Sequence, residues 1–222
     1  MKMIRAAILG ATGTVGQRMI QLLEKHPWFE ISALAASGNS AGKAYGDAVH
    51  WQLDTPLPAA MRGMTVEECR PELDCDFVLS GLPSSIARQT ELDFAATGRA
   101  VISNASSHRM GPDVPLLIPE INPDHIQAVE VQRQRFGGQG CIVTNPNCST
   151  IGLVIPLAAL ERNFGLEAVH VVTMQALYFE GESGEHIVER EIPEAMRDEA
   201  EAARESMLDA VSMFSDELME AI

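Results

Sequence analysis

Short apolar runs that alternate with helical stretches constrain the fold of this chain more than any other feature of its sequence. Two stretches, residues 17–25 and 84–98, have helical spacing, and Gly98 is a suitable stop for the second. Short apolar strands separated by helices predict an α/β fold with a parallel sheet and helices on both faces. The runs expected to form strands are residues 4–9, 30–36, 76–80, 100–104 and 141–144.

A glycine-rich segment follows the first apolar run and precedes the first helical stretch. Its spacing, Gly-x-x-Gly-x-x-Gly, allows a tight turn and lets backbone amides approach a pyrophosphate at a helix N-terminus. An ordinary strand-to-helix turn is the alternative interpretation. The position after a strand favours a Rossmann-type dinucleotide site. The expected cofactor-binding residues here are Gly10, Thr12, Gly13, Thr14, Val15 and Gly16.

The end of the second apolar run indicates which dinucleotide is preferred. NAD sites usually place an acidic residue after this strand to hold the ribose hydroxyls. Here the segment from Ala35 to Ser40 contains no carboxylate. Ser37, Ser40 and Lys43 are instead suited to hydrogen-bond a 2′-phosphate, so the sequence predicts NADP as the cofactor.

Four cysteines are spaced too far apart for a zinc knuckle, so no metal site is expected. Cys148 stands out because it precedes a helix-like apolar run over residues 150–160, and a helix N-terminus stabilises a thiolate. Cys75 and Cys141 lie within or beside apolar strands and suit buried structural positions. Cys69 lies among charged residues and is interpreted as a bystander. Cys148 is therefore the candidate nucleophile.

The overall charge and hydropathy exclude several classes of function. The formal net charge is −15 and the pI is about 4.7, which argues against nucleic acid or an anionic membrane as a partner. No stretch approaches the roughly 20 apolar residues of a membrane span. The first residues show no cleavable signal, so a cytoplasmic protein is expected.

The acidic charge is concentrated at the C-terminal end. Residues 178–222 contain 14 acidic and 3 basic residues, a net charge of −11, which leaves −4 for residues 1–177. An apolar stripe with spacings of 3 and 4 runs from Met196 to Leu218 along this segment, as in an amphipathic helix. The sequence therefore predicts a cofactor domain over residues 1–177 and an acidic helical tail over residues 178–222.

A hydride cofactor combined with a cysteine nucleophile indicates a particular reaction class. The thiolate attacks an acyl phosphate or an aldehyde, and hydride transfer breaks or makes the resulting thioester. This chemistry needs a general acid/base, commonly a histidine. No obvious candidate stands out among His26, His50, His108, His125, His170 and His186.

Residues 1 to about 177 resemble aspartate-semialdehyde dehydrogenases of the archaeal and fungal type. The resemblance covers nearly four-fifths of the chain, and its motifs are diagnostic in combination. They are Gly10–Gly16, Ala35–Ser37, Ser40–Lys43, Leu82–Ser84, Ser103–Ser106, Arg109–Met110, Ile118–Asn122, Asn145–Thr150 and Met174–Ala176.

The resemblance implies roles for individual residues. Cys148 would form an acyl-enzyme with β-aspartyl phosphate, and hydride from NADPH would release the semialdehyde. Gln175 would orient the substrate beside the cysteine, and Arg109 would bind the acyl phosphate. Asn104 would border the nicotinamide and the substrate. The loop formed by Leu82, Pro83 and Ser84 would border the nicotinamide.

Beyond Met174-Gln175-Ala176 the sequence departs from this family. Members continue into a substrate and dimerisation domain that carries the catalytic histidine and a carboxylate-binding arginine. Here residues from about 176 to 222 resemble a segment of translation elongation factor G, which indicates a hybrid chain. We therefore expect impaired aspartate-semialdehyde dehydrogenase chemistry, with a homo-oligomer expected of a complete enzyme.

Two alternatives to this expectation stay open. One is a non-catalytic NADP-binding scaffold. The other is a fragment of a related malonyl-CoA or N-acetylglutamyl-phosphate reductase, which combines a cysteine with the same type of cofactor domain.

Overall fold

The computed structural model describes residues 2–172 of the chain. Contacts group Met1–Val171 into one compact unit. The predicted domain boundary at residue 177 and the predicted tail over residues 178–222 lie outside the described residues and stay predictions, as does the hybrid origin of the chain.

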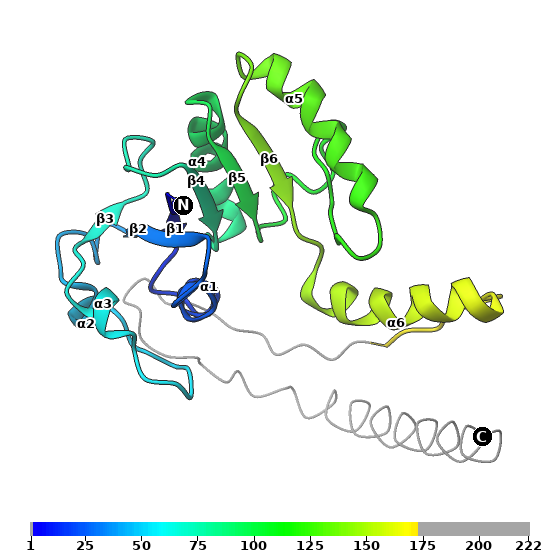
Figure 1. Cartoon of the computed structure of the whole chain (residues 1–222), viewed down its shortest axis with the longest axis horizontal. Coiled ribbons are helices and arrows are strands. Elements are labelled where there is room, and N and C mark those ends of the chain that lie inside the picture. Colours follow the sequence, from blue (N-terminus) through cyan, green and yellow to red (C-terminus); the bar gives the residue numbers. More distant parts are fainter. Residues whose placement is uncertain (1, 173–222) are drawn as a thin grey trace, which may run out of the picture. The chain divides into compact units, whose positions relative to one another are not determined.

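Six parallel strands form one sheet in this unit (Figure 1). Their order across the sheet is β3-β2-β1-β4-β5-β6. All five runs expected as strands are strands, and the strand order and parallel pairing confirm the predicted Rossmann-type α/β fold. In sequence order the strands are β1 (Ile4–Leu9), β2 (Phe29–Ala36), β3 (Val66–Glu68), β4 (Phe77–Ser80), β5 (Ala100–Ser103) and β6 (Cys141–Thr144).

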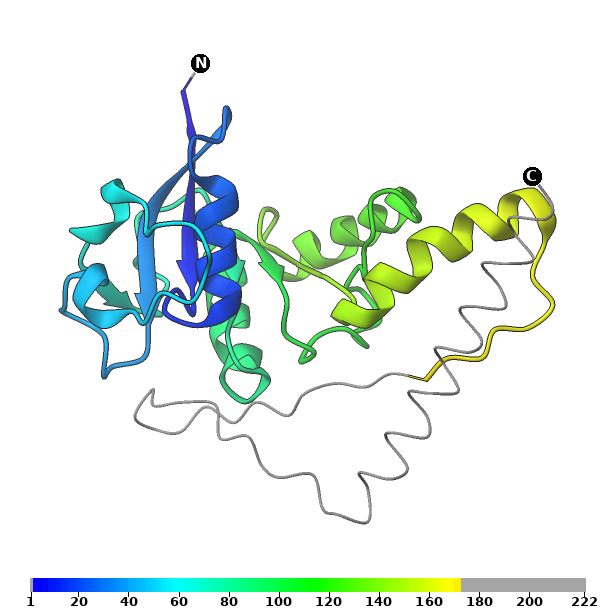
Figure 2. The same cartoon turned by 90° about the horizontal axis from the view of Figure 1, so that it is seen from below.

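Helices connect these strands and follow the last one. Both helical stretches expected from the sequence form, as α1 and α4, and α1 runs alongside β1 (Figure 2). Gly98, with φ +87°, follows the end of α4 as expected of a helix stop. The helical segments are α1 (Thr14–Leu23), α2 (Tyr45–Ala48), α3 (Ala59–Arg62), α4 (Ser84–Ala96), the 3-10 helix η1 (Pro123–Ala128), α5 (Val129–Arg135) and α6 (Cys148–Phe164).

Each face of the sheet has its own hydrophobic core. Successive side chains of a strand point to opposite faces, so neighbouring residues of β1 enter different cores. Ala7 and Leu9 pack in the cluster that contains Phe94 of α4. Ile8 packs in the other cluster with Ile20 of α1. Helices therefore cover both faces of the sheet, as predicted.

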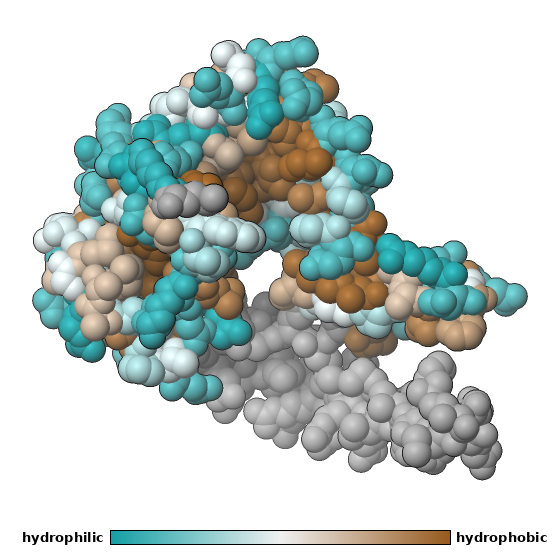
Figure 3. Space-filling model, viewed as in Figure 1, coloured by the Kyte–Doolittle hydropathy of each residue, from teal (hydrophilic) through white to brown (hydrophobic). Residues whose placement is uncertain are grey.

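The helix expected over residues 150–160 is longer at both ends. It begins at Cys148, passes through Pro156 and ends at Phe164. No residue of α6 is buried by the described part of the chain, and Ile155 and Leu160 are exposed apolar side chains. Figure 3 shows apolar residues at the surface of the described part of the chain.

Several short elements were not expected from the sequence: β3, α2, α3, η1 and α5. They are three to seven residues long, too short to show a helical or alternating hydrophobic period. Within residues 2–172, no helix is long and apolar enough to cross a membrane.

Candidate active site

The carboxyl ends of the central strands lie level with one another. Leu9 of β1 is paired with Ser80 of β4, Ser80 with Ser103 of β5, and Ser103 with Thr144 of β6. The segments that follow these four residues therefore begin at one edge of the sheet. Ligands of open α/β sheets bind at this edge. Four segments therefore lie near one another at this edge of the sheet. They are the glycine loop (residues 10–16), the Leu82–Ser84 segment, the segment that begins at Asn104 and the segment that leads from Asn145 to Cys148.

The glycine loop after β1 has no room for side chains at two of its glycines. A Cβ on Gly16 would lie 2.3 Å from the carbonyl oxygen of Gly10 and 2.7 Å from Cα of Ala11. Gly10 has φ +73°, and a Cβ there would lie 2.8 Å from the carbonyl oxygen of Gly81. The turn at the start of α1 is therefore tight, and the amides of the first helical turn have no partners within the helix.

Two buried side chains, which the sequence reading missed, hold the carbonyl groups of this loop. The Tyr45 hydroxyl donates to the carbonyl oxygen of Ala11 at 2.7 Å. Nε2 of Gln17 donates to the carbonyl oxygen of Thr12 at 2.9 Å. Because the carbonyl groups of Ala11 and Thr12 already accept hydrogen bonds from these buried side chains, the loop is suited to present its amides to an anion. Neither residue belongs to the glycine pattern, and burial of polar side chains is not visible in a sequence.

The segment after β2 forms a turn beside the glycine loop, since Ala35 of β2 pairs with Leu9 of β1. The amide of Ser40 donates to the carbonyl oxygen of Ser37 at 2.9 Å. Ser37 and Lys43 are exposed and Ser40 is half-buried, so their side chains are available to a ligand. The NADP-binding role of this turn stays a prediction.

The segment after β4 leads directly into α4. Leu82 is buried, Pro83 caps the helix and Ser84 begins it. Gly81 adjoins the first turn of α1, because a Cβ on Gly81 would lie 3.1 Å from the Val15 side chain. The Leu82–Ser84 segment and the glycine loop are therefore neighbours, as a shared cofactor site requires.

Arg109 joins the segment after β5 to the segment that carries the candidate nucleophile. Its Nε donates to the carbonyl oxygen of Asn145 at 2.8 Å, and its Nη2 donates to Asn104 O at 2.8 Å and Pro146 O at 3.4 Å. The side-chain amide of Asn145 also donates to Oδ1 of Asn104. Within residues 2–172 Nη1 of Arg109 has no hydrogen bond. Binding of an acyl phosphate by Arg109 stays a prediction, and the contacts show a second, local role.

Cys148 is the first residue of α6 and is exposed. Asn147 caps the helix, with its Oδ1 accepting from the amide of Ser149 at 3.0 Å. The thiol therefore lies at a helix N-terminus, the setting that the sequence predicted.

The other cysteines are less accessible. Cys75 and Cys141 are buried in the sheet region, and burial raises the pKa of both thiols. Cys69 is half-buried, with a pKa also raised by burial, and its sulfur contacts the carbonyl oxygen of Ala36 at 3.7 Å. Cys148 is the exposed thiol of the described segment.

A further polar cluster lies beneath this edge of the sheet. Glu91 of α4 is fully buried, and its Oε1 accepts hydrogen bonds from Ser80 at 2.6 Å and from Ser103 at 2.7 Å. His108 was interpreted as a surface or satisfied core histidine, and its Nε2 lies 3.6 Å from Oε2 of Glu91. Glu91 was not expected from the sequence, because its burial is visible only in the folded structure.

Two expectations concern absences or undescribed residues. Gln175, expected to orient the substrate, lies outside the described residues. Over residues 2–172, no group of three or more potential metal ligands gathers in one place.

Comparison with known families decides the class of this chain. A sequence model described as the NAD binding domain of semialdehyde dehydrogenase matches residues 5–129, more than half of the chain. The chain belongs to the semialdehyde dehydrogenase family. The matched residues include the glycine loop.

Curated relatives support the resemblance predicted from the motifs. The aspartate-semialdehyde dehydrogenase of Methanothermobacter thermautotrophicus is 49% identical over 184 residues, covering 82% of this chain and 53% of the relative. That of Cryptococcus neoformans is 48% identical over 187 residues, covering 82% of this chain and 51% of the relative. The chain therefore spans about half the length of the curated relatives it matches.

Solved structures share the fold. The aspartate-semialdehyde dehydrogenase of Candida albicans, solved with NADP, superposes with a TM-score of 0.68 at 48% identity, covering 74% of this chain and 48% of that one. Aspartate-semialdehyde dehydrogenase II of Vibrio cholerae, complexed with ASA, superposes with a TM-score of 0.56 at 30% identity over 75% of this chain and 49% of that one.

Proposed function

We propose that this chain supplies the NADP-binding and thiol-bearing part of an aspartate-semialdehyde dehydrogenase. The reaction is reduction of β-aspartyl phosphate to aspartate semialdehyde through a thioester on Cys148. The observation that carries the proposal is the Arg109 link. It joins the segments after β5 and β6 beside a thiol at a helix N-terminus, at the same sheet edge as the glycine loop.

The residues proposed to hold the cofactor form a continuous set along the edge. The glycine loop would bind the pyrophosphate through the amides at the start of α1, while Ser37, Ser40 and Lys43 would bind the 2′-phosphate. Leu82, Pro83 and Ser84 would border the nicotinamide. The NADP bound in the Candida albicans relative supports this cofactor. When bound, NADPH supplies the hydride.

The proposed chemistry of the thiol balances without any other redox partner. The Cys148 thiolate attacks the acyl carbon, a carbon–sulfur bond forms and inorganic phosphate leaves. Hydride addition at the thioester carbon then expels the thiolate and gives the aldehyde. Arg109 would hold the phosphate group with its remaining donors, and Gln175 would orient the acyl group beside the sulfur.

An assay of the reverse reaction tests the proposal. The 222-residue chain is mixed with aspartate semialdehyde, inorganic phosphate and NADP, and the appearance of NADPH is followed by absorbance. We expect NADP binding and slight or no turnover by this chain alone. By the family resemblance, the acid/base histidine belongs to the second domain, and acid/base catalysis contributes about 10²–10⁴-fold.

Formation of the thioester is the more sensitive measurement. Incubation with β-aspartyl phosphate without cofactor should add an aspartyl group to Cys148, detected by mass spectrometry of peptides. The Cys148→Ala variant should lose the adduct and keep NADP binding. If the wild-type chain binds NADP but forms no adduct, the proposed enzymatic role of Cys148 is refuted, and the interpretation as a non-catalytic NADP-binding scaffold is left.

The same assay separates the related reductases. Malonyl-CoA and N-acetylglutamyl phosphate are offered in place of β-aspartyl phosphate under the same conditions. Preferential acylation of Cys148 by either compound would overturn the proposed substrate while retaining the nucleophile.

A further inference from the structure

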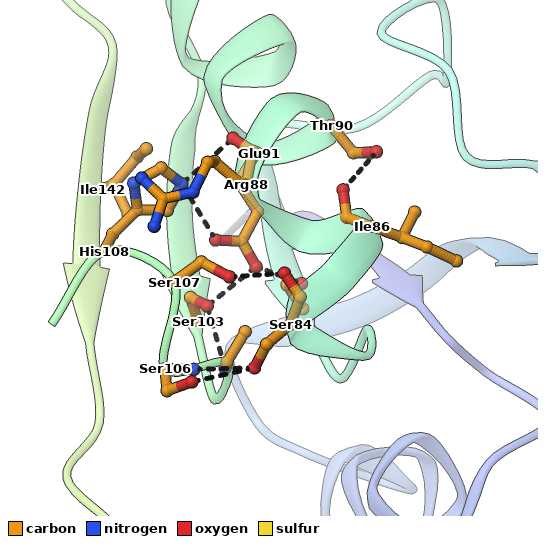
Figure 4. A network of polar contacts seen from close by, with 12 residues as sticks. Ser84, Ile86, Arg88, Thr90, Glu91, Ser103, Ser106, Ser107, His108 and Ile142 are labelled. Carbon is orange, nitrogen blue, oxygen red and sulfur yellow. Dashed lines mark hydrogen bonds and ion pairs between the residues drawn. The ribbon is translucent and has the colours of Figure 1, made fainter. Parts of the chain in front are cut away.

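One buried carboxylate ties the ends of two central strands to α4 (Figure 4). Oε1 of Glu91 accepts hydrogen bonds from the hydroxyls of Ser80 and Ser103, which end β4 and β5 and are paired in register. The Ser103 hydroxyl oxygen in turn accepts from the amide of Ala105 at 3.0 Å. Glu91 therefore fixes the point at which the chain leaves β5.

The second oxygen of the same carboxylate faces a histidine. Oε2 of Glu91 is buried and accepts no hydrogen bond, which is costly for a charged oxygen unless a cation lies close by. Nε2 of His108 lies 3.6 Å away and is 3.1 Å from the carbonyl oxygen of Arg88 (Figure 4). Burial raises the pKa of Glu91, while the two serines and His108 lower it. His108, when protonated, supplies the charge that offsets burial.

Further contacts hold the same segment along the start of α4. The Ser107 hydroxyl donates to the carbonyl oxygen of Ser84 at 2.7 Å. The amide of Ser106 donates to Oγ of Ser84 at 3.2 Å (Figure 4). Residues 103–108 are thus attached to one helix at successive points, and the next residue is Arg109.

Arg109 connects residues 103–108 to the segment that follows β6. Its Nε and Nη2 donate to the carbonyl oxygens of Asn145 and Pro146. These two residues come shortly before Cys148, and Pro146 is buried while Cys148 is exposed. Hydrogen bonds and the chain between them therefore connect Glu91 to the backbone that leads to the thiol.

We propose that Glu91 is a positioning residue for the thiol: through Ser103 and His108 it fixes the Arg109 segment, and Arg109 fixes the backbone before Cys148. The inference rests on the proposed function only in treating Cys148 as the nucleophile. A carboxylate that merely stabilised the sheet would act equally on all parts of the fold. A positioning carboxylate acts on Cys148 specifically, and it does so through Arg109.

The rate at which iodoacetamide alkylates Cys148 measures this effect in the 222-residue chain. Peptide mass spectrometry follows Cys148 separately, with buried Cys75 and Cys141 as internal references for unfolding. We expect Glu91→Leu to lower the Cys148 rate about three- to tenfold, which lies within the range of couplings measured in polar networks. Asp93→Asn, on the same helix with an exposed carboxylate that accepts from Gln89, is the matched control and should leave the rate unchanged.

Two milder variants divide the effect between the hydrogen bonds and the charge. Glu91→Gln keeps an oxygen for the two serines and removes the charge that faces His108. Its effect should be smaller than that of Glu91→Leu and should match that of His108→Gln. These variants also decide the question if Glu91→Leu does not fold.

A double-mutant cycle with Arg109→Lys tests the route. In the Arg109→Lys background, Glu91→Leu or Glu91→Gln should change the Cys148 rate no further. The Arg109 Nε–H resonance in a ¹⁵N-correlated NMR spectrum should move in both Glu91 variants and stay in place in Asp93→Asn. The resonance is a direct reading of the bond to Asn145.

The opposite results would overturn the inference. Equal effects of the Glu91 variant in both backgrounds, or an unmoved Arg109 resonance, would leave Glu91 a structural residue. Failure of the proposed function is visible separately, because it shows as absence of the aspartyl adduct in the wild-type chain, whatever the alkylation rates.

Discussion

At the scale of single residues, buried polar side chains contribute to the candidate site by hydrogen-bonding to its backbone. Tyr45 is fully buried, and its hydroxyl donates to the carbonyl oxygen of Ala11 in the glycine loop. Burial raises the pKa of its hydroxyl, so this group stays protonated and remains a donor throughout the neutral range. The Tyr45 hydroxyl therefore remains hydrogen-bonded to the glycine loop at any pH in the neutral range.

Removal of this hydroxyl should weaken both the fold and the cofactor site. Tyr45→Phe leaves the carbonyl of Ala11 without its donor, at an expected cost of about 1 kcal/mol in the free energy of unfolding. It should also raise the Kd for NADP. Urea unfolding and a fluorescence titration measure the two effects. Thr90→Val, which removes a hydroxyl bonded to Ile86 O on α4, is the control and should leave the Kd unchanged.

Glu91 makes the stability of the chain depend on pH. Burial raises the pKa of its carboxyl above the ordinary value of about 4.3, so the folded state binds this proton more tightly than the unfolded state. The contribution of Glu91 to stability is therefore greatest below the unfolded pKa and is lost as pH rises through the folded pKa.

Comparison with Glu91→Gln isolates this contribution. The difference in unfolding free energy, wild type minus variant, should fall as pH rises above about 4.3. The His108→Gln background removes a side chain that lowers the pKa of Glu91 and should enlarge the fall. Urea midpoints measured across this range check both statements. A difference that grows with pH would contradict the raised pKa.

At the scale of elements, the sequence was most informative where an element is long or regularly patterned. Apolar runs and helical spacing predicted five of the strands and two of the helices: β1, β2, β4, β5, β6, α1 and α4. β3 is three residues long, and its place at the edge of the sheet depends on pairing with β2, which no local pattern encodes. The extension of α6 back to Cys148 depends on the Asn147 cap, which was visible in the sequence but not used.

The same distinction applies to the site. Gly10–Gly16 and Cys148 were predicted because their chemistry is local, whereas Gln17 and Glu91 act through contacts with other segments of the fold. Gln17 bonds to the carbonyls of Thr12 and His50, which lie on different segments. Such contacts exist only after the strands have paired.

The turn from β1 into α1 gives the sharpest prediction at this scale. Gly16→Ala places a Cβ against backbone atoms of Gly10 and Ala11, which have no freedom to move aside. We expect a loss of about 2–3 kcal/mol of stability, in the range for overpacked sites, together with loss of NADP binding. Gly63→Ala, where a Cβ meets nothing within 4 Å, is the control and should retain both. Thermal unfolding and the NADP titration measure the outcome.

At the scale of the whole molecule, cofactor preference should appear as a difference in stability. A ligand at about 100 times its Kd adds ~2.7 kcal/mol to a protein that binds it only when folded. NADP should therefore raise the Tm by about 5–10 °C for a chain of this length, and NAD at the same concentration should raise it less. Equal shifts with the two cofactors would refute the preference for NADP.

Variants of the turn after β2 connect this result to its residues. Ser37→Ala combined with Ser40→Ala should reduce the Tm shift caused by NADP toward that caused by NAD, with Lys43 retaining part of the difference. Both serines are exposed or half-buried, so the variant should keep the Tm of the protein without cofactor. Differential scanning fluorimetry measures all of these shifts in one experiment.

The level register of Leu9, Ser80, Ser103 and Thr144 fixes a length scale for the chemistry. Neighbouring strands are about 4.8 Å apart, so the loops after β1 and β6 are separated by three such steps, about 14 Å along the sheet edge. Backbone hydrogen bonds, which are the same for every sequence with this strand order, set that interval. Substitutions in the loops therefore change how tightly ligands are bound. The distance between the glycine loop and the segment that carries the thiol is set by the strand order and does not depend on the loop sequences.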